Sequence, residues 1–109
     1  MTKKEQIKVV SSVYDVEYKK SIKDHRNYEL LGQISYDSLW IRIWSKIPRK
    51  KQLRAIVHEG THAMSNEMNL DLPEKTILPL SNAIYAFIID NKWLIKEILE
   101  LNEKEGKAK

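Results

Sequence analysis

The sequence predicts an α+β fold, in which a small antiparallel sheet is followed by a long helix and one or two further helices. Two short runs of alternating apolar residues, 30–36 and 39–44, flank Asp37-Ser38 and indicate a β-hairpin. Between residues 53 and 68, apolar residues recur at steps of three and four, which is the spacing of one helix face. Strands therefore come first and helices after them.

Length and composition indicate a single domain. The 109 residues fit one compact unit, which we place at residues 1–109, with frayed termini at about 1–6 and 103–109. The apolar fraction of 42% and charged fraction of 31% are those of an ordinary globular protein. Because the chain has no cysteine, any transition-metal site must use His, Asp or Glu.

The strands are expected in the first half of the chain. Residues 7–20 are rich in β-branched and aromatic side chains with partial alternation, which predicts a first strand, and the polar residues 21–28 predict a loop. Gly32 is a candidate bulge in the next strand. Alternate residues of a strand point to opposite faces, so we expect the aliphatic side of residues 39–44 to meet the core: Leu39, Ile41 and Ile43.

The helices are expected after residue 44. Ser45 is a candidate N-cap for a helix that continues to about residue 68. A second helix is predicted from about Glu74, after a short linker. Residues 91–93 should interrupt it before an amphipathic segment at residues 94–101.

The first of these helices carries a His-Glu-x-x-His motif, His58-Glu59-Gly60-Thr61-His62. On a helix the four-residue step places both imidazoles on one face, where they can reach a single zinc ion. Glu59 lies beside such a metal, where it can take a proton from the attacking water and pass it to a leaving amine. The motif therefore predicts a zinc-dependent hydrolase, most naturally a peptidase, with Zn²⁺ as cofactor and Glu59 as general base.

Catalytic zinc sites usually have three protein ligands, so a third ligand is needed. Glu74 is the leading candidate, because it begins the helix expected to pack antiparallel against the motif helix; its other role would be a favourable charge at a helix N-terminus. Asn82 and Asp90, further along that helix, are kept as alternative ligands or as groups that hydrogen-bond to a ligand and orient it. His25 lies in the polar loop, where an exposed histidine is the commoner case.

The charge balance allows two readings of the basic residues. Nineteen Lys and Arg against fifteen Asp and Glu give a net charge of +4, with basic residues grouped around residues 49–54 and at both ends. Such groups can bind nucleic acid, but no DNA- or RNA-binding motif is recognisable, and a solvated helix face explains them as well. We therefore expect no nucleic-acid partner. No membrane-length apolar run and no apolar signal region are seen, so we expect a soluble, cytoplasmic protein without a membrane partner.

The order of these features resembles the ImmA/IrrE-like zincin domains common in phages and mobile elements. The resemblance spans most of residues 30–91. It is carried by Leu30-Leu31, by the segment 56–64 around the HExxH motif, and by a following helix that begins at Glu74 and continues with Ile77, Leu80, Ser81 and Ile84. It implies a minimal zincin-like fold in which a small sheet precedes the HExxH helix.

The resemblance also implies a function. Zinc would be held by His58, His62 and a glutamate of the following helix, which maps onto Glu74, with Glu59 as the base. The substrate would be a protein or peptide, with a repressor as one candidate, and a phage-encoded enzyme would act in the host cytoplasm. The alternative is a catalytically inactive zincin-fold module that binds a protein partner. Neither reading fixes an oligomeric state.

Overall fold

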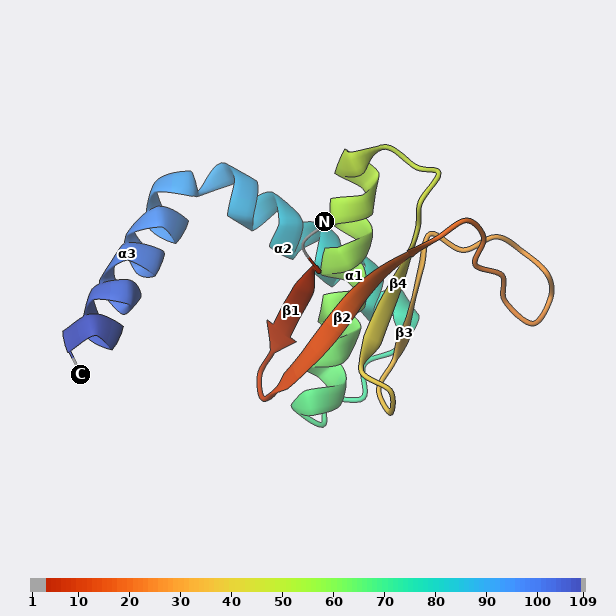
Figure 1. The fold of residues 1–109 in the computed structure, drawn as a ribbon, viewed down its shortest axis with the longest axis horizontal. Helices are drawn as coiled ribbons and strands as arrows, with labels where there is room; N and C mark the ends of the chain where they lie inside the picture. Colours follow the sequence, from red (N-terminus) through yellow and green to blue (C-terminus); the bar gives the residue numbers. More distant parts are fainter. Residues whose placement is uncertain (1–3, 109) are drawn as a thin grey trace.

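The computed structural model describes residues 4–108, which form four strands followed by three helices (Figure 1). The α+β class expected from the sequence is confirmed. The strands and helices are β1 (Gln6–Val9), β2 (Ser12–Lys19), β3 (Gly32–Ser35), β4 (Trp40–Trp44), α1 (Arg49–Glu67), α2 (Glu74–Asp90) and α3 (Lys92–Ala108). The predicted fraying at 1–6 and 103–109 falls partly on residues 1–3 and 109, outside the described residues.

The four strands form one mixed sheet in the order β1-β2-β4-β3. The pairs β1–β2 and β3–β4 are antiparallel, but β2 and β4 are parallel, so the expectation of an antiparallel sheet was wrong at this one pairing. The cause is the connection between β2 and β3, at residues 20–31. It spans two strand spacings, about 10 Å, so β3 lies at the edge of the sheet and a gap is left between β2 and β3. β4 then returns into the gap between β2 and β3, and therefore runs parallel to β2.

The single strand expected at residues 7–20 is a hairpin of β1 and β2. The chain reverses at Val10-Ser11, with Val9 paired to Ser12. Val10 has a φ of 56°, in the left-handed region that β-branched residues avoid. No Gly, Asn or Asp marks the turn, which is why the sequence pattern did not reveal it.

The core lies between one face of the sheet and α1 (Figure 1). Ile41 and Ile43 are fully buried, as predicted for the aliphatic face of the last strand, whereas Leu39 is a turn residue with a φ of 58° that packs at the edge of the core. The buried residues of α1 are small or polar instead of the large apolar ones that define its periodicity: Ala55, Glu59, Gly60, Thr61, Ala63 and Ser65. Small side chains allow α1 to lie close to the sheet.

The helix boundaries follow the sequence signals except at one cap. α1 begins after Pro48, and Ser45 does not cap it; the Ser45 N–H donates to the Lys19 carbonyl oxygen instead. α2 begins at Glu74 as expected, and Asn91 separates it from α3. In Figure 1, α3 leads away from the sheet and from α1. Within residues 4–108, no helix combines the length and apolar character needed to cross a membrane.

Candidate metal centre

His58 and His62 lie one turn apart on the face of α1 that meets α2. Their ring centroids are 5.1 Å apart, with the ring planes at 68°. Contacts between the two helices pair early residues of one with late residues of the other, as in Arg54 with Tyr85 and His58 with Ser81. α2 therefore runs antiparallel to α1, as predicted, and its first turn lies beside His62.

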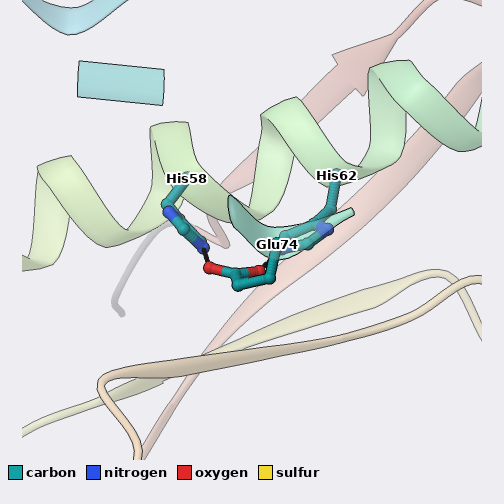
Figure 2. Close-up of side chains that lie close together, drawn as sticks. All are labelled: His58, His62 and Glu74. Atoms are coloured by element: carbon teal, nitrogen blue, oxygen red, sulfur yellow. Dashed lines mark hydrogen bonds and ion pairs between the residues drawn. The ribbon is translucent and has the colours of Figure 1, made fainter. Parts of the chain in front are cut away.

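Glu74 brings its carboxylate to both histidines (Figure 2). Its Oε1 is 2.8 Å from His58 Nε2, and its Oε2 is 2.6 Å from His62 Nε2. The connection between the helices is held by Ser65, whose carbonyl oxygen accepts from the Leu70 N–H and whose hydroxyl accepts from the Leu72 N–H. This turn closes the twelve-residue interval between His62 and Glu74.

The orientation of His58 is fixed by Ser81, a buried residue of α2. The Ser81 hydroxyl donates to the Leu78 carbonyl oxygen at 3.0 Å, so its Oγ is free to accept from His58 Nδ1–H at 3.1 Å. This tautomer leaves the lone pair of His58 on Nε2, the atom that faces Glu74. A positive centre, either a proton or a metal ion, must lie between Nε2 and the Glu74 oxygen 2.8 Å away.

The donor set is one that fits a divalent metal. Nitrogen or oxygen atoms of His58, His62 and Glu74 all lie within 4.8 Å of one another, and no other such group is found among residues 4–108. Two imidazoles and one carboxylate are a common ligand set of catalytic zinc sites, in which a fourth position is left for water or substrate. The Glu74 side chain is 61% exposed, so this fourth position can open to the outside.

Glu59, the second residue of the motif, is buried against the sheet. It is 7% exposed, and burial together with the nearby charge of Glu74 raises its pKa from 4.5 to about 7. Gly32 of β3 lies against it: a Cβ on Gly32 would be 3.3 Å from Glu59 Cγ and Oε2. Gly32 pairs with Ile43 in regular register, so it is no bulge, and its missing side chain makes room for the carboxylate.

A cavity of about 960 Å³ opens in front of these residues. β3, one of the two edge strands of the sheet, runs along the cavity. The apolar lining of the cavity includes Leu30, Leu31, Ile34 and Leu78. Lys50, Lys51 and Arg54 line the part that lies toward the start of α1. The cavity thus joins the His58, His62 and Glu74 cluster to an apolar wall and a basic end.

Tyr36 is a site residue that sequence reasoning missed. It lies in the β3–β4 turn and lines the cavity together with His62 and Glu59. Partial burial, and secondly the charge of Glu59, raises the pKa of its phenol, so the group stays protonated at neutral pH and can donate a hydrogen bond. In the sequence, Tyr36 is marked only as a tyrosine at the end of a predicted strand, which does not by itself indicate a site residue.

The other candidate residues lie outside the cluster. Asn82 lines the same cavity but contributes no atom to the donor group. Asp90 ends α2, sixteen residues after Glu74, which is about 24 Å along a helix. His25 is exposed in the loop after β2. Of the proposed third ligands, only Glu74 has its carboxylate beside both histidines.

Comparison with known proteins gives no relative. No protein-family model matches the chain, and neither a curated protein nor a solved structure matches it significantly. The function must therefore be argued from the positions and chemistry of the residues described above.

Proposed function

We propose that this chain is a zinc-dependent metallopeptidase, in which His58, His62 and Glu74 hold Zn²⁺ and Glu59 is the general base. The observation that carries the proposal is the position of the Glu74 carboxylate, 2.8 and 2.6 Å from the two Nε2 atoms. It supplies the third ligand that an HExxH motif alone lacks. A zinc ion bound there would polarise a substrate carbonyl and lower the pKa of water.

Glu59 moves the proton in this proposal. Its carboxylate accepts a proton from the attacking water and delivers it to the nitrogen of the leaving amine. A base that must also act as an acid works best with a pKa close to the working pH, and burial of Glu59 shifts its pKa in that direction. Gly32 keeps the space that the carboxylate occupies.

Two further residues support the reaction. Ser81 accepts from His58 Nδ1–H and so keeps Nε2 available as a ligand atom. Tyr36 lines the cavity with a protonated phenol, which can donate a hydrogen bond to the oxyanion that develops on the substrate carbonyl.

The cavity suits an extended polypeptide as substrate. An edge strand offers backbone groups for pairing with an added strand, and β3 presents such an edge along the cavity. The apolar wall can take a substrate side chain. In line with the resemblance to ImmA/IrrE-like proteins, we propose a cytoplasmic protein substrate, with a repressor as the leading candidate.

The alternative function is a binding module that keeps the zincin-like site without turnover. The exposed apolar surface of α3 favours a partner-binding role in addition to the site. Turnover separates the two functions, because a binding module would hold metal and partner but cleave neither partner nor peptide.

The test combines metal content with peptidase activity. Plasma mass spectrometry should find about one zinc per chain, lost in His58→Ala, His62→Ala and Glu74→Ala and retained in Asp90→Ala, a carboxylate of the same helix far from the cluster. Glu59→Gln should keep the zinc and lose cleavage of an unstructured protein substrate. Absence of zinc after reconstitution of the wild-type chain would refute the proposal.

A further inference from the structure

α3 exposes an apolar face that the rest of the fold covers only at its start. Ile98 is 48% exposed and Leu101 is 54% exposed, and Leu94 lies one turn before Ile98 on the same side of the helix. Figure 1 shows α3 standing apart from the sheet and α1. No residue of α3 is buried among those whose burial is described, 92–105.

Such a helix needs a partner. A 17-residue helix that packs only at its start, where Leu94 and Ile95 are half-buried, is marginal in water, since most helix stability comes from burying an apolar face. Folded monomers rarely expose contiguous apolar surface of this kind. α3 also carries four Lys and four Glu, so it lacks the basic polar face of a helix that binds anionic membranes.

The spacing of residues on α3 matches one half of a coiled coil. Leu94, Ile98 and Leu101 follow each other at steps of four and three, the a and d positions of a heptad repeat. In that register Glu97 and Lys104 lie seven residues apart on the same flank of the apolar face. They carry opposite charges. When two copies of this helix lie antiparallel, the Glu97 side of one copy can therefore face the Lys104 side of the other.

We propose that α3 pairs with α3 of a second copy of this chain, in antiparallel orientation about a twofold axis. Ile98 of each copy then packs against Leu101 of the other, and the same register places Glu97 of each copy opposite Lys104 of the other. A parallel pair would instead set Glu97 against Asn102, without opposite charges. The self-complementary flank is the reason for choosing a second copy over an unrelated partner.

Sedimentation equilibrium of the full chain tests this pairing. The wild-type chain should be a dimer, and Ile98→Asp should make it monomeric. Leu99→Asp is the matched control, because Leu99 is 64% exposed but lies outside the a, d face in this register, so this variant should remain dimeric. Circular dichroism and urea unfolding confirm that each variant is folded.

Charge exchange tests the orientation. Lys104→Glu places two glutamates opposite each other and should weaken dimerisation about tenfold, and Glu97→Lys combined with Lys104→Glu should restore it. A wild-type chain that stays monomeric up to about 1 mM overturns the proposal and points to a separately encoded partner. A dimer that survives Ile98→Asp, or that the double exchange does not restore, also overturns it.

Discussion

Gly32 lies directly against the buried carboxylate of Glu59, and a side chain at Gly32 would meet Glu59 Oε2 at 3.3 Å. The second glycine near Glu59, Gly60, has only Ile7 Cδ1 at 3.5 Å from the position of its missing Cβ, an ordinary contact. The two glycines therefore have different roles, although both lie within the site region.

Alanine at the two glycines should have opposite effects. Gly32→Ala should displace Glu59, reduce kcat/KM about tenfold or more and cost about 1 kcal/mol of stability, because it overpacks the site. Gly60→Ala should stabilise the chain by about 1 kcal/mol through better helix propensity, with activity retained. Peptidase assays and urea unfolding measure both, and equal effects of the two variants would contradict this assignment.

Burial of Glu59 predicts that the stability of the protein without bound metal depends on pH. Its folded-state pKa of about 7 lies above its ordinary 4.5, so the folded state holds the proton more tightly, and stability falls as the pH rises between these values. Glu59→Gln removes the titration. In chelator, this variant should match wild type below pH 4.5 and be more stable by about 3 kcal/mol above pH 7. A stability difference independent of pH would argue against a buried, protonatable Glu59.

Ser81 should control metal affinity through His58. Ser81→Ala removes the acceptor for His58 Nδ1–H, and loss of such a partner typically weakens metal binding by 10- to 100-fold. Competition with a chelating dye measures the affinity. Ser21→Ala, which removes an exposed hydroxyl bonded to Glu29, is the control and should leave zinc binding unchanged.

The sequence revealed the parts of the site that depend on local spacing. The four-residue step from His58 to His62 places both rings on one helix face, and the start of a helix at Glu74 follows from the linker before it. Contacts between distant segments were not predictable in this way. The approach of Gly32 to Glu59 and the cavity position of Tyr36 depend on how β3 lies along α1, and alternation along a strand does not encode which strand it pairs with.

The turn at Val10 should be a site of strain that substitution relieves. Val10 has a left-handed φ of 56° and is 55% exposed, so its side chain gains little from burial. Val10→Gly should raise the free energy of unfolding by about 1 kcal/mol. Val13→Gly, at an exposed position with regular strand geometry, should lower it instead. Thermal and urea unfolding compare the two variants, and a loss of stability in both would show that Val10 is unstrained.

The basic end of the cavity should select acidic substrates. Arg54 and Lys50 precede His58 by one and two turns of α1, about 6 and 12 Å along the helix, and Arg54 is held over the Tyr85 ring at 5.0 Å. An extended peptide advances about 3.3 Å per residue, so these cations meet side chains roughly two to four residues from the cleaved bond.

A peptide with Asp or Glu at these positions should therefore be cleaved with a kcat/KM about tenfold above that of its Asn or Gln counterpart. This ratio should become smaller in high salt, which screens the charges. Arg54→Glu should abolish or reverse the preference, whereas Lys23→Glu, on the exposed loop after β2, should not change it. Cleavage of both peptides at equal rates would contradict the predicted preference for acidic substrates but not the proposed peptidase activity. Absence of cleavage of both peptides by the wild-type chain would instead count against the proposed activity itself, because the basic end can bias a reaction only if the proposed metal centre performs it.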